Sequence, residues 1–281
     1  MDNKLEIAGK PLEQVSREDL KFFPSAMLEV AYNSIDANTS QRRKAIKAKK
    51  LIVKEIWEKD FINLEILRQY TAVYFASGND IEYPLCLGAR KLMLVDPKFK
   101  YNTDVQEVIN KINQITEEEV RVIEEEGNPI VEFQFDFGKG QEKVSVEFSP
   151  TFYAAKLVKE SHKRATDLLG SGSDHGQQKY DTFNISEPIG LLMGFRSHGV
   201  RAEQAQNVVN QVVPGGYVLT DTQCDLMPLF SKGENSAYDK CSTQERREME
   251  IDQYRKGGWE FINLKSFKGK IYTFLKKMTV E

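Results

Sequence analysis

The sequence predicts an α/β fold in which a mostly parallel sheet of seven strands is covered by helices on both faces. From Thr71 onward, short apolar runs alternate with segments of helical periodicity, and chains that build parallel sheets have this pattern. Small residues separate the first apolar run from the helix that follows it. A last helical segment is followed by two further strand-like runs, which complete the sheet.

The first strand, turn and helix have the features of a nucleotide-binding crossover. An apolar run enters a turn at residues 76–80, where Asp80 is placed to cap a helix over residues 81–89. The next run, at residues 92–95, ends at Asp96. The turn presents backbone N–H groups with little side-chain bulk above them, and the Asp96 carboxylate can accept hydrogen bonds from both hydroxyls of a ribose. We therefore expect a nucleoside ligand here.

The remainder of the chain repeats the alternation of helix and strand. Gly127, Asn128 and Pro129 are typical stop signals for a long helix, and one strand of the hairpin that follows should be the third strand of the sheet. Pro214, Gly215 and Gly216 form a turn before the fifth strand. Helices are expected at 104–126, 151–169, 201–213 and 244–254, and strands at 130–137, 143–148, 180–186, 217–221, 259–264 and 270–274.

Residues 1–69 are predicted to form an N-terminal helical cap region, with residues 70–281 forming the α/β domain. Helices are expected at 16–22, 24–37, 40–59 and 64–69. The third of these helices is amphipathic. Its cationic face carries Arg43, Lys47, Lys50 and Lys54, and its apolar face carries Ala45, Ala48, Ile52 and Ile56.

The basic helix at 42–54 has two interpretations. Its cations could contact RNA phosphates, but no interleaved aromatic residues accompany them. The favoured interpretation is the solvated face of a helix packed on the domain, so nucleic acid is an unlikely partner that is not excluded.

Composition narrows the function classes. The 281 residues include 39 basic and 42 acidic ones, and a net charge of −3 gives no field that favours nucleic acid or a membrane surface. The three cysteines and three histidines are too dispersed for a disulfide framework or a metal site, and no signal peptide precedes the domain. No strand is followed by a Gly-x-Ser-x-Gly elbow, so a serine hydrolase is a poor fit. We expect a cytoplasmic protein without a membrane segment or a metal.

The order of five strand–helix steps and a terminal strand pair resembles the class I S-adenosylmethionine-dependent methyltransferases, which have a Rossmann-like fold. The resemblance covers about residues 70–277. Three local motifs support it: Ser77-Gly78-Asn79-Asp80 at the first loop, Asp96 after the second strand, and Pro214-Gly215-Gly216-Tyr217-Val218-Leu219 before the fifth. The first loop departs from the family, because Gly78 is its only glycine.

The resemblance implies S-adenosyl-L-methionine as cofactor and a methyl acceptor that the sequence does not identify. The implied cofactor-binding residues are Ala76, Ser77, Gly78, Asn79, Asp80, Asp96, Pro97 and Ser186. Glu147 and Asp136 are alternative substitutes for the acid that holds adenine in the family. Glu187 and His198 are the candidate bases, since we expect them to flank the carboxyl end of the fourth strand, where open α/β sheets bind ligands.

Structural alternatives stand beside these assignments. Asp80 could serve only as a helix cap, Glu187 could be a surface carboxylate, and His198 could simply begin a helix. The whole domain could also be a catalytically inactive methyltransferase-like binding or interaction protein. A nicotinamide-dependent oxidoreductase fits less well, because the second and third glycines of its fingerprint are missing after Gly78.

Overall fold

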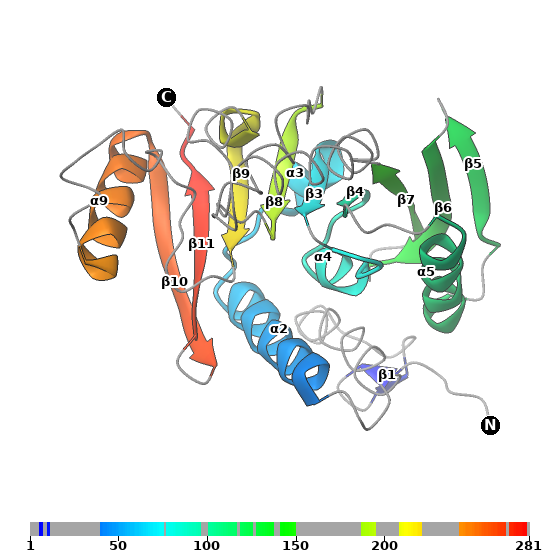
Figure 1. Cartoon of the computed structure of the whole chain (residues 1–281). Coiled ribbons are helices and arrows are strands. Elements are labelled where there is room, and N and C mark those ends of the chain that lie inside the picture. Colours follow the sequence, from blue (N-terminus) through cyan, green and yellow to red (C-terminus); the bar gives the residue numbers. More distant parts are fainter. Residues whose placement is uncertain are drawn as a thin grey trace, which may run out of the picture.

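A nine-stranded mixed sheet forms the centre of the computed structural model (Figure 1). The structure describes residues 6–7, 10–11, 40–75, 77–96, 101–116, 119–125, 128–137, 141–149, 187–194, 208–220, 242–267 and 270–279. The strand order is β10-β11-β9-β8-β3-β4-β7-β6-β5. The strands are β3 (Thr71–Phe75), β4 (Lys91–Val95), β5 (Arg121–Glu125), β6 (Asn128–Asp136), β7 (Gln141–Ser149), β8 (Ile189–Met193), β9 (Val212–Thr220), β10 (Trp259–Phe267) and β11 (Lys270–Lys277).

The middle of the sheet is parallel. Strands β7, β4, β3, β8 and β9 run parallel to one another, and the chain order reverses at β3, which lies between β4 and β8. On one side, β11 is antiparallel to both β9 and β10. On the other side, β6 is antiparallel to both β7 and β5. The expected terminal strand pair is confirmed, and β7 is the hairpin strand that serves as third strand.

The described sheet has nine strands, so the expectation of seven is wrong in number. The extra strands are β5 and β6, and β5 lies within the long helix expected at 104–126. The observed helix α5 (Tyr101–Ile115) ends much earlier. The sequence Arg121-Val122-Ile123 contains two β-branched residues, which favour a strand once β6 offers a hydrogen-bonding partner. Asn128 and Pro129, two of the predicted stop signals, are instead the first two residues of β6.

The fourth and fifth strands also differ from the prediction. The strand expected at 180–186 lies outside the described residues. The fourth parallel strand in chain order is instead β8, an apolar run whose residues are all buried. The strand β9 begins at Val212, inside the helix expected at 201–213. Between the pairs Ile189–Val212 and Leu191–Tyr217 the register shifts, and Gly215 within this irregularity has a φ of +80°. The Pro-Gly-Gly motif is therefore a bulge within β9 rather than a turn before it.

Helices cover the two faces of the sheet. They are α2 (Ser40–Glu58), α3 (Leu64–Gln69), α4 (Glu82–Cys86), α5 and α9 (Thr243–Lys256). One buried apolar cluster joins α2, α3, α4 and α5 to one face, and the other joins α9 to the opposite face. The alternation of β3 illustrates this division, because Ala72 belongs to the first cluster and Val73 and Phe75 belong to the second.

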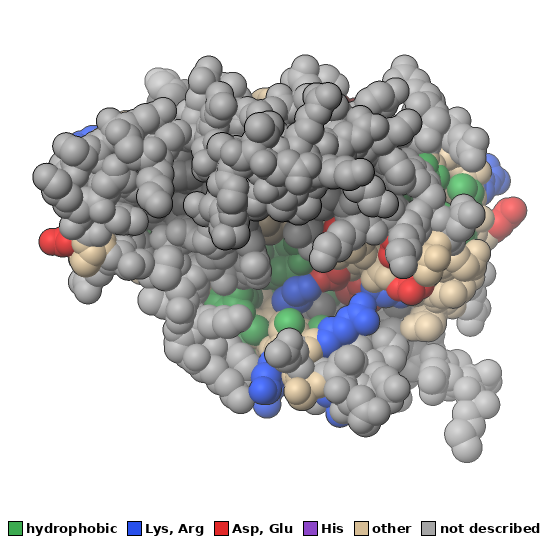
Figure 2. Space-filling model, viewed as in Figure 1, with side chains coloured by type: hydrophobic (Ala, Val, Ile, Leu, Met, Phe, Trp, Pro, Cys, Tyr) green, Lys and Arg blue, Asp and Glu red, His purple; other side chains and the backbone are tan. Residues whose placement is uncertain are grey.

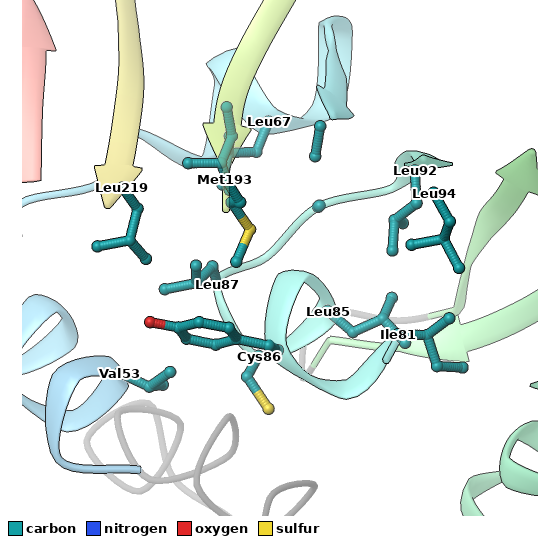
Figure 3. Close-up of a cluster of buried hydrophobic side chains, with 14 of the residues drawn as sticks. Val53, Leu67, Ile81, Leu85, Cys86, Leu87, Leu92, Leu94, Met193 and Leu219 are labelled. Carbon is teal, nitrogen blue, oxygen red and sulfur yellow. The ribbon is translucent and has the colours of Figure 1, made fainter. Parts of the chain in front are cut away.

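The predicted amphipathic helix is confirmed as α2, with one exception on its apolar face. Ala48, Ile52 and Ile56 are buried, whereas Ala45 is exposed. Figure 3 shows Val53 of α2 and Cys86 and Leu87 at the end of α4 within one cluster of apolar side chains. The arrowheads of β3, β8 and β9 point toward α4 and α2 in Figure 1, so these helices lie at the carboxyl ends of the strands.

The remaining predictions for the chain have mixed outcomes. The predicted helices at 64–69 and 244–254 are confirmed as α3 and α9, and the two last strands are β10 and β11. The helices expected at 16–22, 24–37 and 151–169 lie outside the described residues. Two short strands, β1 (Glu6–Ile7) and β2 (Lys10–Pro11), form a separate antiparallel pair. Among the described helices, none has the length and apolarity that a membrane crossing requires.

Candidate functional site

The candidate site lies at the carboxyl ends of β3 and β4, beside the point where the strand order reverses. In open α/β sheets this crevice is the usual place for a ligand. The loop that follows β3 leads into α4, and the neighbouring strand β4 ends at Val95, directly before Asp96. Parallel pairing of Phe75 with Val95 brings these two strand ends together. The fold therefore brings the loop and Asp96 close together in space, although they are distant in sequence.

A hydrogen bond joins the loop to the acid. The Gly78 N–H donates to Asp96 Oδ2 over 2.8 Å. Gly78 has a φ of +55°, in the left-handed region that side chains other than glycine rarely adopt. Among the described residues, only Asp96 Oδ2 comes within 4 Å of where a Cβ of residue 78 would stand, at 3.9 Å. The backbone conformation thus requires the single glycine of the loop, and no other described atom outside its chain neighbours crowds this position.

Asp80 is held by groups from three elements. Its Oδ2 accepts a hydrogen bond from the Lys49 ammonium of α2 and another, over 3.3 Å, from the Tyr74 hydroxyl of β3. Its Oδ1 accepts from the Tyr83 N–H in the first turn of α4, also over 3.3 Å. This last contact is the capping interaction that the sequence predicted. Asp80 therefore has a structural role as well as a place at the site.

The Lys49 ammonium is surrounded by groups that favour its charge. It lies 5.1 Å from the ring centroid of Tyr83 and 5.8 Å from that of Tyr74, which are cation–π distances. Burial lowers the pKa of Lys49, but the Asp80 carboxylate and Tyr74 outweigh it and raise this pKa above its usual value. Burial raises the pKa of Asp80, yet Lys49 and Lys111 outweigh it and lower this pKa overall. Both partners are ionised at neutral pH.

A second polar network holds the other side of the loop. Lys111 of α5 donates to the Asn79 carbonyl over 2.8 Å and to Asn79 Oδ1 over 3.0 Å. The same ammonium pairs with Glu82 at 3.0 Å, and the Asn79 amide donates to Glu107. Burial and the nearby Asp80 charge raise the pKa of Glu82 above its usual value, against the opposing effect of Lys111. The loop is clamped between α2 and α5.

The space-filling view shows this mixture of charges. Lys and Arg side chains lie next to Asp and Glu side chains below the centre of Figure 2, with hydrophobic side chains beside them. Ser77 and Asn79 are themselves buried. The backbone of the loop and the Asp96 carboxylate are therefore the groups best placed to meet a ligand, while Asn79 and Asp80 hold the loop in shape.

The structure brings together only part of the predicted cofactor site. Ser77, Gly78, Asn79, Asp80 and Asp96 lie in one place. Ala76, Pro97, Ser186 and His198 lie outside the described residues.

The predicted position of Glu187 is wrong. It precedes β8 instead of following the fourth strand, and its Oε2 accepts a hydrogen bond over 2.7 Å from the hydroxyl of Thr71, the first residue of β3. Glu187 therefore lies at the amino ends of the strands, opposite the expected site. The error arose because we expected the fourth strand to end just before Glu187, whereas β8 begins just after it, at Ile189.

The two candidate adenine acids lie at different ends of β7. Asp136 pairs with Gln141, at the amino end of that strand. Glu147 pairs with Met93 of β4, two residues before β7 ends at Ser149. Only Glu147 therefore lies toward the carboxyl end at which the loop and Asp96 meet.

Sequence reasoning missed Lys49, Tyr74, Glu107 and Lys111. They come from α2, β3 and α5, and each was expected only as part of a helix or strand. One signal was available for Lys49, which lies between the buried Ala48 and Ile52 on the packed side of its helix. A cation at such a position needs a buried partner.

Within the described residues, no group of three or more His, Cys, Asp or Glu side chains is arranged to hold a metal ion.

Comparison with known proteins gives matches at the level of structure only. No protein-family profile and no curated protein sequence matches the chain. The solved structures that are similar to it include an O-methyltransferase family protein from Burkholderia thailandensis and a candidate O-methyltransferase from Klebsiella pneumoniae. The first has a TM-score of 0.35 and 11% identity over 90% of this chain, and this chain spans 63% of the length of that one. The second has a TM-score of 0.32 and 8% identity, covering 95% of this chain and 93% of that one.

Proposed function

We propose that the chain is a class I S-adenosylmethionine-dependent methyltransferase that transfers a methyl group to an acceptor still to be identified. The observation that carries the proposal is the hydrogen bond from the Gly78 N–H to Asp96 Oδ2 at the point where the strand order reverses. It joins the first loop to the acid after the second strand, 18 residues later. The terminal pair β10 and β11 supports the same family resemblance. The cytoplasm remains the expected location.

The residues present fit the nucleoside part of this cofactor. A carboxylate such as Asp96 accepts hydrogen bonds from ribose hydroxyls, and among the described residues no side chain other than that of Asp96 comes within 4 Å of a Cβ placed on Gly78. The amino-acid part meets a different situation, because Lys49 already holds Asp80. A ligand ammonium group must therefore compete with Lys49 for the Asp80 carboxylate, or bind elsewhere.

The chemistry asks little of the chain beyond positioning. When bound, the cofactor supplies an activated methyl group. The contribution of the chain is to hold the nucleoside at Asp96 and the loop, and to present the acceptor from the side of the site on which α2 lies. The network around Lys49 and Lys111 holds the loop in one shape before the nucleoside binds. Glu187 lies at the amino ends of the strands, away from the proposed site, so we assign no general base.

A catalytically inactive, methyltransferase-like binding protein is the second candidate. The observation that favours it is the engagement of Asp80 by Lys49, Tyr74 and Tyr83 in a loop with a single glycine. In that case the loop would keep its architecture without binding the cofactor well. The two candidates differ in whether S-adenosylmethionine binds.

The test is a calorimetric titration of the purified chain with S-adenosylmethionine and S-adenosylhomocysteine. The reduced nicotinamide dinucleotide serves as the comparison ligand. We expect saturable binding of the two sulfur nucleosides that Asp96→Ala weakens by about 1 to 3 kcal/mol, because the ribose hydrogen bonds are lost. The matched control is Asp252→Ala, which removes an exposed carboxylate on α9, away from the site.

Each result of the titration has a separate meaning. Binding that weakens with Asp96→Ala and not with Asp252→Ala supports the methyltransferase assignment and justifies a screen of methyl acceptors. No heat up to millimolar ligand favours the inactive relative. Preferential binding of the nicotinamide dinucleotide would overturn both.

A further inference from the structure

Three side chains around the Lys49 ammonium form what we call the cation cage: Asp80, Tyr74 and Tyr83. The Asp80 carboxylate pairs with Nζ, and the ring centroids of Tyr74 and Tyr83 lie 5.8 Å and 5.1 Å from it. The two rings meet edge to face, with centroids 6.2 Å apart and an interplanar angle of 73°. Carboxylates and aromatic faces both attract ammonium groups. The cage therefore has the chemistry of a cation-binding site, whichever molecule supplies the cation.

The walls of the cage belong to one continuous part of the chain, and its occupant does not. Tyr74 lies in β3, Asp80 lies in the loop after it, and Tyr83 lies in α4. Asp80 is held between the other two by the Tyr74 hydroxyl and the Tyr83 N–H, each over 3.3 Å. Lys49 reaches the cage from α2, 31 residues before Asp80, at the end of a flexible side chain. Lys49 is therefore an occupant of the cage, because the walls hold one another without it.

The occupied cage is still reached by solvent. The side chains of Lys49 and Asp80 are 21% and 22% exposed. The other ammonium group of the site, that of Lys111, is held by Asn79 and Glu82. Removal of Lys49 would therefore leave Asp80 as a mostly buried carboxylate without its direct cation, and such a group attracts another cation. A small ammonium ion is the replacement that the cage would accept.

We propose that Asp80, Tyr74 and Tyr83 bind a primary alkylammonium group, and that Lys49 fills this site as a tethered competitor that a ligand ammonium must displace. The cage lies beside the proposed nucleoside site, because Asp80 belongs to the same loop as Gly78, whose N–H contacts Asp96. A ligand with an ammonium group then meets a cost that a neutral ligand with the same nucleoside does not. The cage itself is independent of the proposed methyltransferase activity, and its consequence for S-adenosylmethionine rests on that activity.

A purely structural ion pair makes a different prediction. In that case the whole Lys49 side chain, anchored on α2, is what stabilises the fold, and a free amine does not replace it. In a cage the walls are already in place, so an amine from solution restores the contact. Chemical rescue of a variant without the lysine distinguishes the two.

The experiment is thermal denaturation of the full Lys49→Ala chain in a concentration series of propylammonium chloride. Propylammonium supplies the alkyl chain and the nitrogen that this substitution removes, and sodium chloride at equal ionic strength is the reference. The melting temperature of Lys49→Ala should rise and saturate, with half of the effect reached between about 1 and 100 mM. The wild-type chain should show no such rise, because Lys49 already fills the cage.

Three variants control the rescue, and circular dichroism checks that each one folds. Lys54→Ala removes an exposed lysine of the same helix and should not respond to propylammonium. Lys49→Met fills the path of the lysine side chain without a charge and should also not respond. Lys49→Ala/Asp80→Asn lacks the carboxylate and should lose the rescue.

The outcomes of the rescue separate cleanly. No rise in the Lys49→Ala chain would overturn the proposal. A rise of the same size in the wild-type chain, Lys54→Ala or Lys49→Met would place the amine elsewhere and would also overturn it. Rescue that survives the Asp80→Asn substitution would show that the carboxylate does not bind the amine.

A second measurement tests the competition with a ligand. Calorimetry compares S-adenosylhomocysteine with 5′-methylthioadenosine, which has the same nucleoside but no amino-acid part. Relative to the neutral ligand, S-adenosylhomocysteine should bind about tenfold more tightly to Lys49→Ala than to the wild type. An unchanged ratio would contradict displacement of Lys49 by the ligand. Failure of both nucleosides to bind either chain would contradict the proposed function, and the propylammonium series would still decide whether the cage binds an amine.

Discussion

The two ends of the parallel strands carry polar networks of different kinds. At the amino ends, Glu142 of β7 accepts hydrogen bonds from two arginines. Arg90 reaches it through Nε at 2.9 Å and Nη2 at 3.1 Å, and Arg68 reaches it through Nη2 at 2.8 Å and Nε at 3.2 Å. At the carboxyl ends, lysines hold Asp80, Asn79 and Glu82 around a glycine loop.

The contacts of the two networks indicate that the amino-end network serves stability alone. Both oxygens of Glu142 are taken by guanidinium groups, Arg90 is only 5% exposed, and its Cζ lies 3.7 Å from the centroid of the Phe137 ring. The hydrogen bonds of Arg90 and Arg68 lower the pKa of Glu142 to about 2 despite its partial burial. The carboxyl-end network instead surrounds a loop with a left-handed residue and an acid beside it. We assign the ligand to that end.

The largest expected effect comes from breaking the amino-end network. Glu142→Ala leaves the buried Arg90 guanidinium without its carboxylate, and we expect a loss of about 3 kcal/mol in the free energy of unfolding. Urea denaturation measures it. The control is Glu132→Ala, which breaks an ion pair with the exposed Lys143 and should cost less than about 1 kcal/mol. Equal losses in the two variants would show that burial of Arg90 does not set the cost.

A smaller loss is expected when the carboxyl-end network is broken. Lys49→Met keeps the length of the side chain but removes the cation from Asp80, and we expect a loss of about 2 kcal/mol in the same measurement. The matched control is Lys54→Met on the same helix, because Lys54 is exposed and pairs only at the surface with Glu58. A Lys49→Met chain as stable as Lys54→Met would contradict a stabilising role for the Lys49–Asp80 pair.

The acid dependence of stability should report on Glu142. Its pKa is lowered in the folded chain from 4.5 to about 2, so its contribution is present above pH 4.5 and is lost as the pH falls toward 2. The shift corresponds to about 3 kcal/mol, and solvent screening of the partly exposed carboxylate reduces it, so the difference in stability between the wild type and Glu142→Gln should shrink by about 1.5 kcal/mol over that interval. Urea titrations at a series of pH values measure it. A difference that stays constant down to pH 2 would contradict the charged pairing.

The smallest effect is expected at the loop glycine. Gly78→Ala places a Cβ on a residue with a φ of +55°, which costs about 1 kcal/mol of backbone strain. The nearest described atom is 3.9 Å away, so no steric clash adds to the cost. The comparison variant is Gly257→Ala at the end of α9, where φ is −79°. Thermal denaturation should show Gly78→Ala as the less stable of the two.

The sequence predicted the fold where local pattern and environment agree. The alternating strands, the final pair and the amphipathic helix α2 follow from periodicity, and the first loop and Asp96 follow from their position beside parallel strands. The strand β5 was missed because its acidic flanks read as a helix until β6 supplied a partner.

The polar clamps could not be predicted because they join elements distant in sequence. Lys49 and Asp80 are 31 residues apart, and Arg90 and Glu142 are 52 apart. The first pair depends on where α2 packs, and the second depends on the pairing of β4 with β7; periodicity carries neither kind of information. The error for Glu187 has another cause. The fourth strand begins later than expected, so this residue lies at the amino ends of the strands instead of their carboxyl ends.

The most direct test of the account is hydrogen exchange of backbone amides with and without millimolar S-adenosylhomocysteine. The proposed site predicts slower exchange in residues 77–80 and around Asp96 when the ligand is bound, with no change near Arg90 and Glu142 at the amino ends. Slowing that is confined to the amino ends, or absent from residues 77–80 while the ligand binds, would contradict the placement of the site.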